Sequence, residues 1–251
     1  MTQSDDTTGA KVLEAACRHA QAYLTGANDR PVPAQVSQAE IRARLVTDLP
    51  ETGTPAEQVI EEFTKAAEGG IATTIGGRFH GFVIGGAHPV GVAADWLAAA
   101  WDDPPGTPLI SPFGCAVDGI AGDWVRQLLL LPDGASVGLV TGATMGNFTG
   151  AIAARHALLQ RLDWDVEARG LFGAPEIRVI VGADVHPTML LALRFAGFGA
   201  ERIIRIRTTR DGAMDAEALA SALEQPAAAT LVCAQAGQVN TGACDPFAQL
   251  A

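Results

Sequence analysis

Residues 135–159, ASVGLVTGATMGNFTGAIAARHALL, place a short apolar segment, a turn of small residues and a helical pattern in direct succession. Residues 136–140 are mostly apolar and alternate little, which is typical of a strand buried on both faces. From Phe148 onward, apolar residues recur at roughly helical spacing. A buried strand that leads straight into a helix is the repeating unit of parallel α/β sheets, so this stretch predicts the α/β fold class.

The turn at residues 141–147 has features of a phosphate site. Backbone N–H groups are unpaired at the start of a helix, and their dipoles add to a partial positive charge. Small residues at Gly142, Ala143 and Gly146 would let an anion approach the backbone closely. A plain strand-to-helix turn is the alternative interpretation, and the local sequence does not separate the two.

Two common phosphate loops do not fit this turn. A nucleoside-triphosphate loop requires a lysine after its last glycine, and Asn147 follows Gly146 instead. A dinucleotide loop requires the spacing G-x-G-x-x-G, which Gly142 and Gly146 do not provide. The remaining hypothesis is a loop that holds a single phosphate without a lysine.

The second half of the chain alternates between strand and helix patterns. Strands are predicted at residues 177–181, 202–208 and 230–234, with helices at 188–195 and 215–223. This rhythm predicts a mostly parallel sheet with right-handed crossovers, and residues 202–208 read as a strand near its edge. Ligands bind beyond the carboxyl ends of such strands, where both the turn at 141–147 and His186 fall.

The first half of the chain is predicted to be helical and rich in linkers. The expected helices are residues 11–24, 38–45, 55–68, 90–101 and 119–131, the third with Thr54 as cap and Pro55 at its first position. Glycine-dense residues 69–89 are interpreted as lining a pocket mouth, with a surface loop as the alternative. We expect residues 1–105 to form a helical and pocket-loop segment that packs on another subunit or on the main domain, residues 106–251.

Composition and charge exclude several classes of function. The net charge is −11 and there is no basic arm, which argues against nucleic-acid binding. The start of the sequence does not read as a signal peptide, and the apolar run at 128–131 is too short to cross a membrane. Four scattered cysteines are typical of reduced thiols in a cytoplasmic protein, and the spacing of His80 and His88 does not indicate a metal site.

Taken together, five ordered stretches resemble one family. They are residues 78–82 with 85–86, residues 111–112, residues 141–147, residues 184–188, and residues 235–237 with 240–246. The chain resembles the pyridoxal 5′-phosphate (PLP)-dependent amino-acid decarboxylases of group II, which include the aromatic-amino-acid and glutamate enzymes. Each stretch alone is a weak signal, but the ordered set is specific, and it spans nearly the whole chain from Lys11.

The resemblance implies a fold, a cofactor and a set of site residues. The fold is the aspartate-aminotransferase-like PLP fold, fold type I, in a homodimer with intertwined N-terminal helices. Backbone groups at Ala143 and Thr144 would hold the phosphate of PLP, and His186 would lie flat on the pyridine ring as a catalytic residue. Taken without the family, His186 is equally a strand-end histidine satisfied by backbone. Met145 and Gln238 depart from the commoner family residues.

The resemblance also implies that the chain stops before the catalytic centre is complete. The aspartate beside the pyridine nitrogen and the Schiff-base lysine would both lie beyond Ala251. Lys11 and Lys65, the only lysines, match no cofactor lysine, and Asp245 is expected to be structural. We therefore expect the N-terminal part of an L-amino-acid decarboxylase, a carboxy-lyase inactive in this form, whose substrate the sequence does not indicate. The alternatives are a non-catalytic binding or dimerisation protein and another fold type I lyase.

Overall fold

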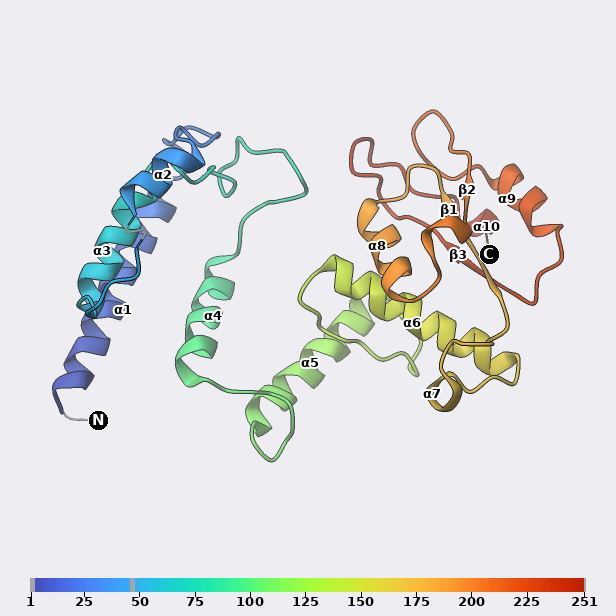
Figure 1. The fold of residues 1–251 in the computed structure, drawn as a ribbon, viewed down its shortest axis with the longest axis horizontal. Helices are drawn as coiled ribbons and strands as arrows, with labels where there is room; N and C mark the ends of the chain where they lie inside the picture. The colour runs from blue at the N-terminus through green and yellow to red at the C-terminus, as the bar shows by residue number, and fades with distance from the viewer. Residues whose placement is uncertain (1–2, 46–47, 251) are drawn as a thin grey trace. The chain divides into compact units, whose positions relative to one another are not determined.

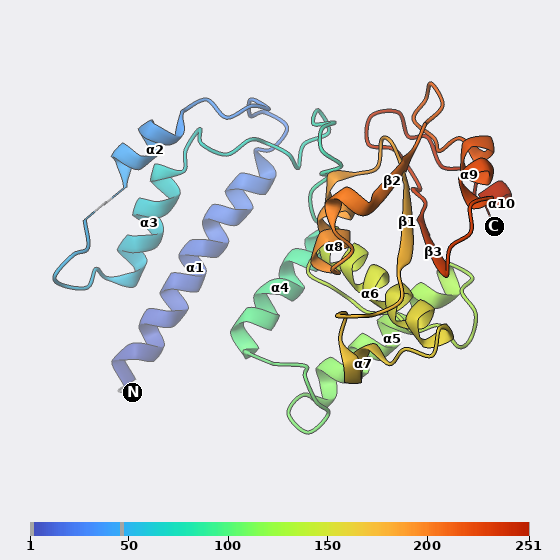
Figure 2. The same ribbon diagram turned by 45° about the vertical axis from the view of Figure 1, so that its right-hand side comes forward.

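The computed structural model describes residues 3–45 and 48–250, and the chain divides into two units, residues 1–102 and 103–251 (Figures 1 and 2). The first unit contains four helices in its described part. They are α1 (Gln3–Thr25), α2 (Gln38–Arg44), α3 (Ala56–Ala66) and α4 (Pro89–Trp101). All four lie where the sequence predicts helices.

Helices α1 and α3 lie side by side in both views and are joined by charged side chains (Figures 1 and 2). Glu61 on α3 accepts hydrogen bonds from Arg18 and, at 3.0 Å, from Nε2 of His19, both on α1. The hydrogen bond from His19 is the main cause that lowers the pKa of the Glu61 carboxyl. The first unit therefore has packing of its own between α1 and α3.

The start of α3 differs from the expectation. Pro55 is the residue before the first helical turn, and no side chain caps this helix, so Thr54 is not the cap. Helix α2, in contrast, begins with a capping box. The Ser37 side chain accepts from the backbone N–H of Glu40, and the Glu40 side chain accepts from the backbone N–H of Ser37. The assignment of residues 69–89 to a pocket mouth stays a prediction, and Phe82 and Val83 within it are largely exposed.

The second unit is built on a parallel sheet of three strands. They are β1 (Ile177–Gly182), β2 (Ile203–Ile206) and β3 (Ala229–Cys233), in the order β2-β1-β3. Both pairings of β1 are parallel, as predicted, and β2 lies at an edge of the sheet as its alternating pattern indicates. The predicted strands at 177–181 and 230–234 each lie within one residue of the observed bounds.

Helices cover both faces of this sheet because β1 is apolar on both sides. Val179 and Val181 pack with residues of α6 (Ala143–Arg161) and α8 (Pro187–Phe195). Ile180 points to the other face and packs with Ile206 and with Leu219 of α9 (Ala216–Leu223). Both views show α8 and α9 on opposite sides of the sheet (Figures 1 and 2). Asp215 caps α9, as predicted, by accepting from the backbone of Ala218 at 2.9 Å.

Two helices of this unit begin earlier than predicted. Helix α5 (Pro112–Leu128) was expected from residue 119, but Ser111 caps it by accepting from the Gly114 backbone at 2.9 Å, and Pro112 suits its first turn. Helix α6 was expected from Phe148 and begins at Ala143, so the small residues of the turn themselves form its first turn. The short elements α7 (Val166–Arg169), η1 (Ala200–Arg202) and α10 (Phe247–Leu250) were not predicted.

The predicted strand at residues 136–140 is wrong for this structure. The segment has no ladder partner among the described residues, and Leu139 and Val140 remain 63% and 44% exposed. A strand exists only where a neighbour exchanges backbone hydrogen bonds with it, so apolar composition alone was insufficient. Strand β3 likewise pairs on one side only, with β1. In the part of the chain that the structure describes, no helix is both long and apolar enough to cross a membrane.

Candidate functional site

The start of α6 is an open helix N-terminus. Gly142 occupies the cap position but has no side chain to accept from the first backbone N–H groups, and a Cβ at this position would point into open space. The N–H groups of Ala143 and Thr144 belong to the first turn, which has no intrahelical acceptors. Because α6 has 19 residues, its dipole adds to their partial positive charge. This end can therefore accept a phosphate group.

His186 follows β1 and is the cap residue of α8. Its Nδ1 accepts from the backbone N–H of Thr188 at 3.2 Å and lies 2.7 Å from the Thr188 hydroxyl oxygen. Its own backbone N–H donates to Oε1 of Gln235, just beyond β3, at 3.0 Å. The residue is exposed, so the ring can be reached by a ligand.

One hydrogen-bonded chain joins the two predicted parts of the site. Asn147, in the second turn of α6, donates through Nδ2 to the Thr188 hydroxyl at 3.4 Å, and that hydroxyl contacts His186. The structure thus brings the beginning of α6 to the histidine at the end of β1. The roles of Asn147, Thr188 and Gln235 were not predicted, although each lies in a stretch that resembled the family.

Asp245 has the structural role that the sequence predicted. Only 6% of the residue is exposed, and its two carboxylate oxygens accept from the backbone N–H groups of Met214 and Gln235, both at 2.7 Å. The Gln235 side chain in turn accepts from the backbone N–H of His186. Asp245 therefore fixes the residue that holds the main chain of His186.

Two other predicted features have structural explanations. Nδ1 of His88 accepts from the backbone of Val90 at 3.3 Å and so caps α4, which makes this histidine a loop anchor. Cys233, the last residue of β3, is largely enclosed, and this burial raises the pKa of its thiol to about 11. The thiol is therefore uncharged at neutral pH. No group of three metal-binding side chains occurs within the described ranges.

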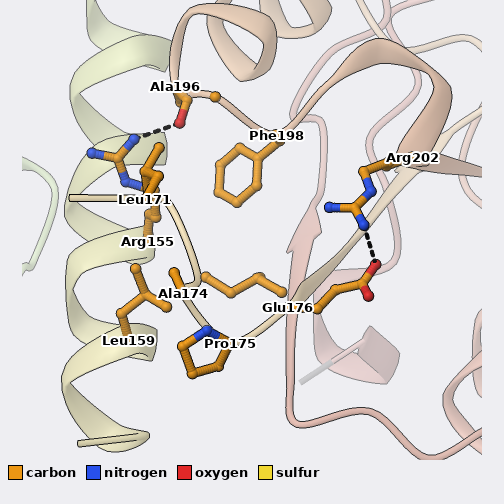
Figure 3. A pocket seen from close by; sticks show the side chains of 11 residues that line it. Arg155, Leu159, Leu171, Ala174, Pro175, Glu176, Ala196, Phe198 and Arg202 are labelled. Atoms are coloured by element: carbon orange, nitrogen blue, oxygen red, sulfur yellow. Dashed lines mark hydrogen bonds and ion pairs between the residues drawn. The ribbon is translucent and has the colours of Figure 1, made fainter. Parts of the chain in front are cut away.

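A separate pocket of about 250 Å³ lies beside the second half of α6 (Figure 3). Arg155 and Arg202 face it from opposite sides, and both already have partners. Arg155 donates to the Ala196 carbonyl, although its Nε is buried with no partner among the described residues, and Arg202 pairs with Glu176 at 3.5 Å. None of the predicted site residues lines this pocket.

Residues 39–251 match the pyridoxal-dependent decarboxylase conserved domain. The chain belongs to this family. The aromatic-L-amino-acid decarboxylase of Bacillus atrophaeus is 24% identical over 233 residues, which cover 91% of this chain and 46% of that protein. Tryptophan decarboxylase 1 of Oryza sativa subsp. japonica is 26% identical over 246 residues, covering 91% and 47%.

Solved structures show the same fold for this decarboxylase-family chain. Mouse CSAD superposes with a TM-score of 0.84 at 21% identity, over 98% of this chain and 52% of that one. Oryza sativa TDC, crystallised with PLP and tryptamine, superposes with a TM-score of 0.83 at 23% identity, over 100% and 55%. The predicted PLP fold of type I is thereby confirmed. The chain spans about half the length of the curated relatives it matches.

Proposed function

We propose that the full-length protein carrying this chain is a PLP-dependent decarboxylase of an L-amino acid. Membership of the pyridoxal-dependent decarboxylase family supports the cofactor and the reaction class. The single structural observation that carries the proposal is the link from the open start of α6 through Asn147 and Thr188 to His186. This link connects an open helix N-terminus, which suits a phosphate, to an exposed imidazole within one unit of the fold.

The residues present fit PLP. The backbone N–H groups of Ala143 and Thr144 would hold its phosphate, since that helix end is uncapped and open. His186 would contact the ring, where it orients the cofactor and can hold a proton on Nε2. When bound, PLP supplies the electron sink that accepts the bonding pair left by departing carbon dioxide. The residues of this chain bind and orient the cofactor.

The proposal extends to the assembly and the domain division. Residues 106–251 would form the first part of the large PLP-binding domain, and residues 1–105 the helical segment that contributes to a homodimer in the cytoplasm. The names of the relatives include tryptophan, tyrosine and acidic-amino-acid decarboxylases, so the proposal names an L-amino acid without choosing its side chain. Aldehyde-forming chemistry is a second candidate because Rhodiola rosea 4-hydroxyphenylacetaldehyde synthase superposes with a TM-score of 0.81.

The phosphate subsite can be tested by removing one backbone donor. In the full-length protein, Ala143→Pro deletes an N–H at the first helical position, which proline favours, and Gly142 already has the extended ψ of 170° that precedes a proline. One lost hydrogen bond to a charged group is worth about 1.5–3 kcal/mol, so PLP affinity should fall roughly ten- to hundredfold. Ala143→Ser keeps the N–H and is the matched control. Equal PLP affinity in both variants would refute the subsite.

The role of His186 can be tested by its removal. His186→Ala should lower carbon dioxide release from L-amino acids by about 10²-fold or more, the scale of a positioned proton-transfer group, with little change in thermal stability. His156→Ala is the control because His156 is a half-buried histidine of the same unit that pairs with Glu167 at 3.6 Å. Unchanged turnover in His186→Ala would remove His186 from the proposed site.

A further inference from the structure

Two groups of Thr188, its backbone N–H and its hydroxyl, contact the same ring nitrogen of His186. The backbone N–H of Thr188 lies 3.2 Å from Nδ1, and the Thr188 hydroxyl oxygen lies 2.7 Å from it. The backbone N–H can only donate, so its hydrogen bond requires Nδ1 to be the acceptor. Nδ1 must therefore be the bare, accepting nitrogen, and the ring proton of the neutral imidazole belongs on Nε2.

The hydroxyl of Thr188 is itself oriented by α6. If that hydroxyl donates to Nδ1, its lone pairs are available, and Nδ2 of Asn147 donates to one of them at 3.4 Å. In this hydrogen-bonded series the Asn147 amide then donates to the Thr188 hydroxyl, and the hydroxyl donates to Nδ1 of His186, so each donor has an acceptor. The contact of Asn147 is the longest of the three, so Thr188 makes the larger contribution to the orientation of the ring.

We infer that Thr188 is a positioning residue that holds His186 as the Nε2–H tautomer and fixes the plane of its ring. This inference rests on the proposed function and deepens it, because a bare Nδ1 turned toward the protein leaves the N–H donor of Nε2 for the ligand. The backbone of His186 is fixed independently, since its N–H donates to Gln235 and Asp245 holds Gln235. The histidine is thus held by α8 at its ring and by the segment after β3 at its main chain.

The tautomer can be measured without cofactor or substrate. In the full-length protein labelled with ¹⁵N-histidine, a two-bond ¹H–¹⁵N correlation spectrum separates a bare ring nitrogen from a protonated one, and His186→Gln identifies the signals. We expect Nδ1 of His186 to be bare and Nε2 protonated. Thr188→Val removes the shorter contact to Nδ1 and keeps the backbone N–H, so both signals should shift part of the way toward an average of the two tautomers. A proton on Nδ1 in the unaltered protein would overturn the inference.

Kinetics with matched variants test whether the positioning matters. Thr188→Val should lower kcat about tenfold with little change in KM, while Thr188→Ser, which keeps the hydroxyl, should retain most of the activity. Thr149→Val is the control because the Thr149 hydroxyl only donates to the Met145 carbonyl within α6. Equal losses in Thr188→Val and Thr188→Ser, or no loss in either, would overturn the role of the hydroxyl.

These outcomes are distinguishable from failure of the proposed function. If the protein neither binds PLP nor releases carbon dioxide, the decarboxylase proposal falls, whereas the tautomer spectrum still reports on Thr188. If turnover is present and the spectrum shows Nδ1 protonated, the decarboxylase proposal stands and the positioning role is wrong.

Discussion

Expressed alone, the 251-residue chain should be incompletely packed, because its surface is too large for its mass. The accessible surface is 17870 Å² for 25.9 kDa. Two separate globular units with the masses of residues 1–102 and 103–251 would together expose only roughly 12,600 Å² by the usual scaling of surface with mass. The excess is roughly 5,000 Å².

Part of this surface consists of large apolar side chains. Among the described residues, the segment of the exposed Leu139 and Val140 has no strand partner, and β3 is open along one edge. Large exposed side chains also gather on α5 and the residues that follow it. They are Phe113, Val117, Ile120, Trp124, Leu128, Leu129 and Leu130. Even 500 Å² of such apolar surface, about a tenth of the excess, corresponds to about 12 kcal/mol at about 25 cal/mol per Å². That amount equals the whole stability of a typical domain, about 5–15 kcal/mol.

The assay compares the 251-residue chain with the full-length protein at equal concentration. The chain alone should bind a hydrophobic dye such as ANS, associate in sedimentation and lack a sharp calorimetric transition. The full-length protein should melt cooperatively and bind little dye. A monomeric 251-residue chain that melts cooperatively without dye binding would refute this reasoning and would favour the non-catalytic alternative.

Three further measurements follow from particular contacts. Asp245→Asn replaces one accepting oxygen by a donor, so the unfolding free energy of the full-length protein should fall by about 1.5–3 kcal/mol in chemical denaturation, and no loss would contradict the two buried hydrogen bonds. Borohydride added after PLP to the 251-residue chain should leave no stoichiometric adduct at Lys11 or Lys65 by mass spectrometry, because both lie on helices of the first unit. Folding lowers the Glu61 pKa, so the stability that its contact with His19 adds should be present above pH 4.5 and lost as the pH falls below it; Glu61→Gln should remove that pH dependence of unfolding.

The sequence predicted a strand or helix best where the pattern of apolar residues in the segment matches its surroundings in the fold. Strand β1 is apolar on both faces and lies in the middle of the sheet, so its pattern and its environment agree. Residues 136–140 have the same kind of pattern, yet they form no ladder. The pattern reports which side chains avoid water, whereas a strand also requires a neighbour, and no described segment supplies one. The starts of α5 and α6 were misplaced because small and capping residues were read as loop.

In the candidate site, too, residues within a local motif were predicted, whereas contacts between distant segments were not. The motifs pointed to Ala143, Thr144 and His186, each adjacent to a recognisable turn. They could not indicate that Thr188 would meet Asn147, 41 residues away, or that Gln235 would meet His186, 49 residues away. Those pairings exist because β1 lies beside β3 and α8 packs on α6, so a hydroxyl, an amide and an imidazole from separate motifs come within hydrogen-bonding distance. Since the partners of His186 are fixed by the sheet order, a change that shifts β3 relative to β1 should disturb the histidine as surely as a change of Thr188 itself.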